Sequence, residues 1–300
     1  MRPSSASGGA VIALNPIQWM ATDDGWIDPS VGPEPGDLLA LVKRSGFDSV
    51  MTDVPAGWST ERYRETVADA GLTPAPGYLV ARFDTPGVTE RAVLDAAARA
   101  AAQHAALGLS DIGLGLPMSK EGPRLRHPAR GVAPSSERLD AVVGLVDKIS
   151  AVMVSEGVRP AFHPHVATWV ETEDETRAVL EAFDDTRLGF LPDTGHLSWA
   201  GTDVKRLVAD YADRIPFIHV KDCRLSVAKR GFESDWDYRR VVLEGVWVEP
   251  GRGELDLVDI LSGLSPSFTG WLMVEVDRPD LPDPYECAEV SASWMRQTFN

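Results

Sequence analysis

The chain has 300 residues, 44% of them hydrophobic and 25% charged, which is ordinary globular composition with enough apolar side chains for a sizeable core. Its 45 Asp and Glu residues outnumber its 29 Lys and Arg residues, and the formal net charge is −16. Such a surface repels phosphate backbones and anionic lipid, so nucleic-acid and membrane partners are disfavoured.

The chain begins with a small, polar stretch, residues 1–10, which we expect to be a disordered leader. The apolar run after it stops at Asn15 and Pro16 and is too short for a signal peptide, and no stretch approaches the roughly 20 apolar residues of a membrane span. The two cysteines, Cys223 and Cys287, lie too far apart to suggest a disulfide framework. We therefore expect a cytoplasmic protein.

Short apolar runs that are typical of buried strands alternate with longer helical patterns along the rest of the chain. The strand-like runs span residues 11–14, 48–53, 73–79, 111–116, 159–163, 188–193, 216–219 and 271–275. The helical patterns span residues 36–45, 60–70, 89–106, 136–156, 173–183, 204–211, 255–261 and 287–298. Ser59 is a start signal for one helix, and Gly46, Gly71 and Gly108 are stop signals for others.

Eight strand–helix units without a second composition block predict an α/β protein with a single domain, a closed (β/α)8 TIM barrel over residues 11–300. An open, doubly wound sheet is the alternative. No Gly-rich dinucleotide fingerprint follows the first run and no phosphate loop occurs, which weighs against it. Residues 119–135 and 224–252 are predicted to be loop insertions at the face that carries the active site in such barrels.

The last four strand-like runs all end in side chains that can bind a metal. These residues are His163, Asp193, His219 and Glu275, with His165 and His196 just beyond the fifth and sixth runs. In a barrel the four ends are neighbours at the C-terminal rim, so two imidazoles and two carboxylates would converge there. Mixed nitrogen and oxygen ligands suit Mn, Co, Zn or Fe better than Ca, and they leave room for an oxygen-bearing substrate.

Each of these residues also has a simpler explanation when it is taken singly. A histidine at a strand end is often just a satisfied polar group, and Asp193 could cap a turn. Four successive apolar runs that each end in a ligand-type residue nevertheless favour one shared site over four unrelated ones.

The strand ends belong to longer motifs. They are Phe-His-Pro-His-Val-Ala-Thr, Asp-Thr-Gly-His-Leu, His-Val-Lys-Asp, Pro-Gly-Arg-Gly-Glu-Leu-Asp and Gly-Trp-Leu-Met-Val-Glu-Val-Asp, and Asn-Pro-Ile-Gln-Trp lies near the start. With these motifs the chain resembles the xylose-isomerase-like superfamily of sugar isomerases and epimerases, and within it the inosose dehydratases. The resemblance spans nearly the whole chain and is strongest over residues 162–277.

The resemblance implies one divalent metal ion, with Mn2+ as the first expectation and Co2+, Zn2+, Fe2+ and Mg2+ as alternatives. It implies Asp193, His219 and Glu275 as ligands. The epimerases usually have Glu at the end of the fifth strand, where this chain has His163, as the inosose dehydratases do. His163 is therefore the expected fourth ligand, with His165 as its alternative, and epimerase chemistry with two Glu residues is disfavoured.

These features lead to the hypothesis of a carbon–oxygen lyase that removes the proton α to the carbonyl of a keto-polyol, such as an inosose or a 3-keto sugar. The candidate catalytic residues are Lys221, His165, His196 and Glu275. A divalent cation beside Lys221 should lower the pKa of its ammonium group towards that of a useful base. An ion pair of Lys221 with Asp222 or Glu275 is the alternative.

Four further residues are candidates for substrate binding. Trp19, Trp169 and Trp199 each lie just past a strand and could pack on the apolar face of a sugar ring, although rim packing is an equal alternative for any one of them. Arg224 could bind a substrate hydroxyl or carboxylate. The expected partner is a small sugar or cyclitol, and the resemblance also allows a homodimer or homotetramer.

Several competing functions share this site. An isomerase or ketose 3-epimerase is the main alternative, and a C-glycoside-cleaving subunit is another. A 3-dehydroshikimate dehydratase would need a cationic clamp, for which Arg82, Arg224 and Arg252 are candidates. An apurinic endonuclease is disfavoured by the charge of −16 and by too few histidines. A sugar-binding module without activity is disfavoured because none of the expected ligands is missing.

Overall fold

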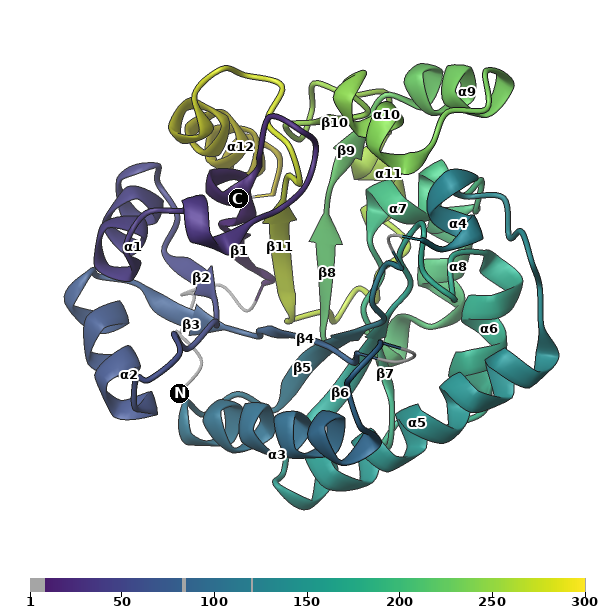
Figure 1. Cartoon of the computed structure of the whole chain (residues 1–300). Helices are drawn as coiled ribbons and strands as arrows, with labels where there is room; N and C mark the ends of the chain where they lie inside the picture. The colour runs from purple at the N-terminus through teal and green to yellow at the C-terminus, as the bar shows by residue number, and fades with distance from the viewer. Residues whose placement is uncertain (1–8, 83–84, 120, 300) are drawn as a thin grey trace.

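Parallel strands run in sequence around a closed barrel in the computed structural model, which describes residues 9–82, 85–119 and 121–299 (Figure 1). The strands are β1 (Val11–Asn15), β2 (Ser49–Met51), β3 (Thr73–Ala75), β4 (Tyr78–Val80), β5 (Asp111–Gly115), β6 (Arg159–His163), β7 (Gly189–Phe190), β8 (Phe217–Val220) and β11 (Trp271–Glu275). One parallel sheet has the order β3-β2-β1-β11-β8 and the other has the order β4-β5-β6-β7. A parallel bridge between Asp193 and His219 joins the two. The predicted TIM barrel is confirmed, whereas residues 1–8 of the expected leader lie outside the described residues.

Helices wrap the outside of the barrel, as Figure 1 shows for α1, α2, α3, α5 and α6. The helices are α1 (Pro35–Arg44), α2 (Thr60–Asp69), α3 (Glu90–Ala106), α4 (Pro123–Arg126), α5 (Ser136–Ser155), α6 (Glu173–Glu181), α7 (Thr194–Trp199), α8 (Val204–Asp210), α9 (Leu225–Glu233), α10 (Tyr238–Leu243), α11 (Leu257–Leu261) and α12 (Pro284–Phe299). Three short 3-10 helices are η1 (Ile17–Met20), η2 (Pro29–Val31) and η3 (Ala212–Arg214). None of the described helices combines the length and the apolar character that crossing a membrane requires.

Helix starts follow the expected capping chemistry. The side chains of Ser59, Thr89, Ser135 and Thr172 each accept a hydrogen bond from the backbone N–H three residues later. Such caps satisfy amides that the first helical turn leaves without partners. They explain why the starts of α2, α3, α5 and α6 lie within one residue of the predicted ones.

The predicted strand 73–79 is broken into β3 and β4. Because of this break, the segment pairs with a different neighbouring strand on each side. β3 pairs with β2, and β4 pairs with β5. Between them, the Gly77 N–H donates to Nε2 of the buried His104 at 2.9 Å. A Cβ on Gly77 would lie 2.2 Å from the Thr52 carbonyl oxygen, so only glycine fits at the break.

His104 should make the stability of the fold depend on pH. Burial lowers its pKa to about 4 from 6.5, because the charged ring would lose its contact with water, and the hydrogen bond of its Nδ1 to the Ala100 carbonyl opposes this shift only in part. Between these two pH values His104 binds a proton in the unfolded chain but not in the native state. The free energy of unfolding therefore falls as the pH drops. We expect a loss of about 2 kcal/mol in the free energy of unfolding between pH 7 and pH 5.

Urea denaturation of the wild type and of His104→Gln at both pH values measures this term. Glutamine can still accept from Gly77 but does not titrate, so the variant should lose less stability than the wild type over the same interval. Equal losses in the two proteins would show that His104 does not contribute.

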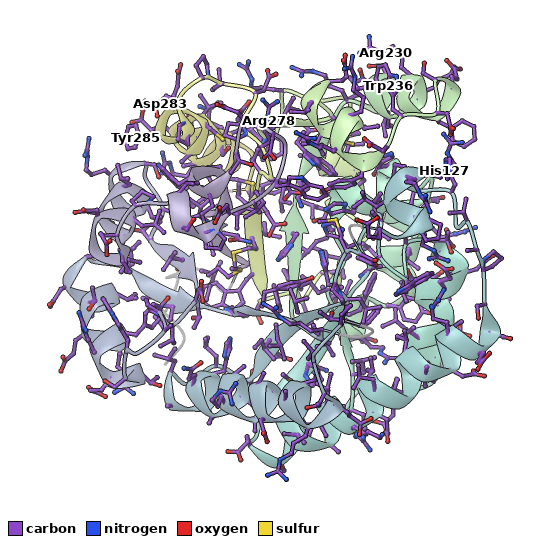
Figure 2. All side chains as sticks on the ribbon, in the orientation of Figure 1. His127, Arg230, Trp236, Arg278, Asp283 and Tyr285 are labelled. Atoms are coloured by element: carbon purple, nitrogen blue, oxygen red, sulfur yellow. The ribbon has the colours of Figure 1, made fainter. Side chains whose placement is uncertain are left out.

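The core has an inner and an outer part. Inside the barrel lie Ala13, Ala75, Ala161, Leu191, Phe217, Trp271 and Met273. The larger outer part fills the space between strands and helices, as the packed side chains in Figure 2 show. The side chains of the inner part of the core fill the barrel. The open space needed for a ligand therefore lies at the C-terminal rim of the barrel.

The two predicted insertions both contain short regular elements. Residues 119–135 include α4, and residues 224–252 include α9, α10 and β10 (Trp247–Val248), which pairs antiparallel with β9 (Asp222–Cys223) beyond the tip of β8 (Figure 1). His127, on the side of the molecule that carries Trp236 in Figure 2, has its Nδ1 2.9 Å from Asp235 Oδ1. The two segments therefore contact each other over the rim.

Candidate metal centre and active site

The candidate site lies where four successive strands end at the rim of the barrel. β6 ends at His163, Asp193 follows β7, β8 contains His219, and β11 ends at Glu275. Asp193 pairs with His219 across neighbouring strands, and Glu275 pairs with Asn15 of β1. The register therefore brings these side chains to the same level of the barrel.

Three of the predicted ligands form a compact group. His163, Asp193 and His219 each offer a ligand atom, and these atoms lie within 4.8 Å of one another. All three side chains are buried, and His163 Nδ1, Asp193 Oδ2 and both ring nitrogens of His219 have no hydrogen-bond partner among the described residues. Buried polar atoms without partners are costly, and a bound cation would satisfy them. The donor set fits a divalent transition metal.

Asp193 has a capping role and a candidate ligand role, and each is performed by a different carboxylate oxygen. Oδ1 accepts the backbone N–H groups of Gly195 at 2.9 Å and His196 at 2.8 Å and so caps α7, while Oδ2 faces the group. The turn-capping role and the ligand role, which were alternatives in the sequence, are thus compatible in the structure.

Glu275 lies beside this group. Its Oε2 is 3.2 Å from His219 Nδ1 and accepts a hydrogen bond from Asn15 Nδ2, and its Oε1 accepts from Lys221 at 2.7 Å. Burial alone would lower the pKa of His219, but Glu275 and Asp193 outweigh it and raise that pKa to about 9. This position therefore stabilises positive charge.

His163 is electrostatically different from His219. Burial is the main cause that holds the pKa of His163 well below its usual range, and the charge of the nearby His219 adds to it. The ring of His163 is therefore neutral. A neutral imidazole is the form that binds a metal.

A second group with similar chemistry lies next to the first. His165, His196 and Asp277 have ligand atoms within 4.8 Å of one another, and the rings of His165 and His196 lie 3.6 Å apart between centroids. Burial lowers the pKa of His165 to about 3, and its Nδ1 is 2.6 Å from the Val166 carbonyl oxygen. Because a carbonyl only accepts, that nitrogen carries the proton and Nε2 has the free lone pair.

The structure places Lys221 among three carboxylates. Its wholly buried Nζ lies 2.7 Å from Glu275 Oε1, 2.7 Å from Asp277 Oδ1 and 3.2 Å from Asp193 Oδ2. Burial opposes the charge, but the three carboxylates outweigh burial and hold the pKa of Lys221 well above its usual value. The predicted lowering depends on a divalent cation beside the ammonium, and it stays a prediction. The ion pair with Glu275 is confirmed, whereas Asp222 instead accepts the N–H groups of Gly251 and Gly253.

A cavity of about 440 Å3 opens onto the first group. Its polar lining consists of Asn15, Tyr78, His163, His165, His219, Tyr238, Glu275 and Asp277, and its apolar lining includes Ile17, Trp26, Ile27, Val80, Leu116 and Met118. Of the predicted catalytic residues, His165 and Glu275 reach the cavity. Lys221 and His196 do not line it, because they are buried behind it.

The predicted tryptophan platform is not on this cavity, because each ring is used elsewhere. Trp169 lies under the Arg138 guanidinium, 3.3 Å from ring centroid to Cζ, and Trp199 stacks on Tyr238 at 5.4 Å. Trp19 lines a different cavity of about 530 Å3. None of these three tryptophans lines the cavity beside the metal group, so their position does not support the predicted contact with substrate there.

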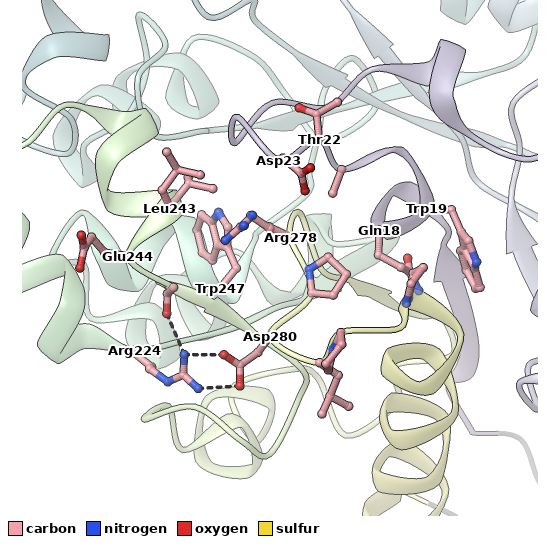
Figure 3. A pocket seen from close by; sticks show the side chains of 17 residues that line it. Gln18, Trp19, Thr22, Asp23, Arg224, Leu243, Glu244, Trp247, Arg278 and Asp280 are labelled. Atoms are coloured by element: carbon pink, nitrogen blue, oxygen red, sulfur yellow. Dashed lines mark hydrogen bonds and ion pairs between the residues drawn. The ribbon is translucent and has the colours of Figure 1, made fainter.

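Arg224 also belongs to the different cavity, which Figure 3 shows. Its guanidinium donates to both carboxylate oxygens of Asp280, at 2.9 and 2.7 Å, and to the Gly245 carbonyl (Figure 3). A bidentate pair of this kind leaves little donor capacity for a substrate. The predicted contact of Arg224 with substrate at the metal group is therefore not supported by its position.

Sequence reasoning missed three residues of the site. Asp277 lies two positions after Glu275, and side chains two apart on a strand share a face, so its position was readable from the period of the strand. Asn15 ends β1 and pairs with Glu275 of the neighbouring strand β11, as Asp193 pairs with His219. Tyr78 follows the break at Gly77, and no pattern in the sequence indicates it.

Comparisons with known proteins agree with the barrel fold. A model of the family described as xylose isomerase-like TIM barrel matches residues 39–298. An inosose dehydratase of Geobacillus kaustophilus (strain HTA426) is 34% identical over 141 residues, which are 46% of this chain and 46% of that protein. The chain spans about half the length of the first inosose dehydratases that it matches.

Two further matches extend over most of the chain. The rhizopine catabolism protein MocC of Rhizobium meliloti is 29% identical over 300 residues, covering 93% of this chain and 85% of that protein. A crystal structure of the IolI protein with a bound zinc atom superposes with a TM-score of 0.66 at 17% identity, covering 96% of each chain. The latter match shows the same fold.

Proposed function

The chain belongs to the xylose isomerase-like TIM barrel family, and from that premise we propose that it is a divalent-metal-dependent carbon–oxygen lyase acting on a keto-polyol. The observation that carries the proposal is the group of His163, Asp193 and His219, which has buried ligand atoms without a hydrogen bond among the described residues. His163 and His219 of this group line the cavity. Buried polar groups without partners mark functional sites because folding alone does not favour them.

We assign His163, Asp193, His219 and Glu275 as the residues that would hold the ion, with Mn2+ as the first choice. A divalent ion there would supply Lewis acidity that stabilises the negative charge developing on the carbonyl oxygen of the substrate. Lys221 would hold Glu275 in position, since its ammonium donates to Glu275 Oε1 at 2.7 Å.

His165 is the proposed base for the proton α to the carbonyl. Its ring lines the cavity, its Nδ1 is fixed by the Val166 carbonyl, and its Nε2 carries a free lone pair. The C–H electron pair would pass to the carbonyl as an enolate, while the proton moves to Nε2.

Tyr78 is the proposed acid for the departing hydroxyl. Burial, reinforced by Glu275, raises the pKa of Tyr78, so its phenol stays protonated on the cavity wall. The enolate electron pair would expel the β-hydroxyl, the C–O bond would break, and the phenol proton would make the leaving group water. The proton on His165 would then return to the tyrosinate through solvent.

The cavity lining supports an uncharged substrate. No Lys or Arg occurs among the residues that line it in the described part of the chain. Phosphate and carboxylate groups are usually bound by such cations, so a phosphorylated sugar or 3-dehydroshikimate fits less well than a neutral inosose or 3-keto sugar. The relatives named inosose dehydratase support the same substrate class.

Incubation of the metal-loaded protein with 2-keto-myo-inositol and with 3-keto-glucosides in deuterated water tests the reaction class. We expect a product lighter than the substrate by one water, detected by mass spectrometry. The variant His165→Gln tests the proposed base. It should retain the metal, but its rate should fall about 100-fold or more, which is the usual contribution of a general base. Deuterium incorporation with an isomer as the only product would indicate an epimerase instead.

A further inference from the structure

The second group, His165, His196 and Asp277, has the composition of a metal site. It combines two imidazoles with one carboxylate, as the first group does, and its ligand atoms are equally close together. Asp277 Oδ2 is 3.4 Å from His196 Nε2. On ligand chemistry alone, the chain has the residues for two ions side by side.

The ammonium of Lys221 lies at the boundary between the two groups. On one side its Nζ contacts Asp277 Oδ1 at 2.7 Å and His196 Nε2 at 3.1 Å, and on the other it contacts Glu275 and Asp193. An ammonium only donates, so His196 Nε2 must accept with its ring lone pair. The Nε2 lone pair of His196 and one carboxylate oxygen of Asp277, which a second ion would need, are therefore already engaged by the ammonium.

The stem of Lys221 is held in place by close packing. A Cβ on Gly195 would lie 2.8 Å from Lys221 Cγ and 2.9 Å from Trp247 Cζ3, so the glycine of the Asp-Thr-Gly-His motif leaves room for the stem. The Nζ also lies 5.1 Å from the centroid of the Trp247 ring, a cation–π distance. The charge is therefore positioned by the fold and does not depend on a flexible surface chain.

We propose that Lys221 is a tethered cation that takes the place of a second metal ion, so that the native protein binds one ion and the second group becomes a metal site only when the ammonium is removed. Three carboxylates, Asp193, Glu275 and Asp277, surround this region. One divalent ion and one ammonium balance their charge, whereas two divalent ions beside Lys221 would not. The inference rests on the proposed metal dependence of the first group.

Metal stoichiometry tests this proposal without any substrate. Wild type, Lys221→Ala and the double variant Lys221→Ala/His196→Ala are dialysed against excess Mn2+, and bound metal is counted by mass spectrometry of the elements. We expect one equivalent in the wild type, two in Lys221→Ala, and one in the double variant, which lacks a ligand of the second group. Circular dichroism checks that each variant is folded.

Asp277→Asn in the wild-type background gives a second measurement that leaves Lys221 in place. It should still bind one equivalent, because Asp277 contacts the ammonium and not the ion. The proposal would be overturned if the wild type bound two equivalents of metal or if folded Lys221→Ala bound only one. A loss of metal in Asp277→Asn would overturn it as well. No bound metal in the wild type would instead contradict the proposed metal-dependent function itself.

Discussion

Replacing Asp193 with asparagine is expected to remove bound metal and to lower kcat/KM about a thousand-fold while leaving the protein folded. The amide oxygen can still accept from Gly195 and His196 and cap α7, as Asp193 Oδ1 does at 2.9 and 2.8 Å. The amide nitrogen takes the place of Oδ2, and it offers no lone pair to a cation. A metal that stabilises developing charge contributes several kcal/mol, and about 4 kcal/mol corresponds to a thousand-fold in rate.

Asp203→Asn is the matched control for this substitution. Asp203 caps α8 through the Arg206 N–H at 3.1 Å, so the chemical change and the capping role are the same, but the residue lies outside the candidate site. Metal content and steady-state kinetics of the two variants separate the ligand role from the capping role. If Asp193→Asn keeps its metal and its rate, Asp193 is a structural cap only.

Replacing Arg124 with alanine is expected to destabilise the protein by about 3–5 kcal/mol, the cost of leaving a buried partner charge uncompensated. Only 4% of the Arg124 side chain and 16% of the Glu175 side chain are exposed, and the guanidinium donates to both Glu175 oxygens. Arg124 also donates to the carbonyls of Val132 and Thr168. It therefore fastens the segment 119–135 to the loop between β6 and α6.

Urea denaturation of Arg124→Ala, Glu175→Ala and the double variant Arg124→Leu/Glu175→Leu measures this effect. Replacement of both charges by apolar side chains leaves no buried charge, so the double variant should recover most of the loss. A loss below about 1 kcal/mol in Arg124→Ala would mean that water reaches the pair and screens it.

Strand order and most helix limits followed from the sequence because they depend on local patterns. The apolar run 159–163 coincides with β6, and Ser59 caps α2 where its hydroxyl predicts. The helix α7 was missed since Thr194–Trp199 is only six residues long and follows a strand directly, so its period is too short to recognise. The split of the strand 73–79 was missed because it depends on His104, which is distant in sequence.

The same distinction applies to the candidate site. Strand ends in a barrel converge by topology, so the meeting of His163, Asp193 and His219 was predictable. The partners of a long side chain depend on its rotamer and on distant loops. For that reason the ion pair of Lys221 with Asp277, the bidentate contact of Arg224 with Asp280 and the stacking of Trp199 on Tyr238 were not predictable.

Anomalous diffraction from crystals grown with Mn2+ is the most direct test of the metal centre. We predict a single strong peak bonded to Asp193 Oδ2 and to one ring nitrogen each of His163 and His219, with Glu275 as the remaining protein ligand. A map with no peak at these atoms, or with the ion bound elsewhere on the rim, would contradict the assignment on which the proposed chemistry depends.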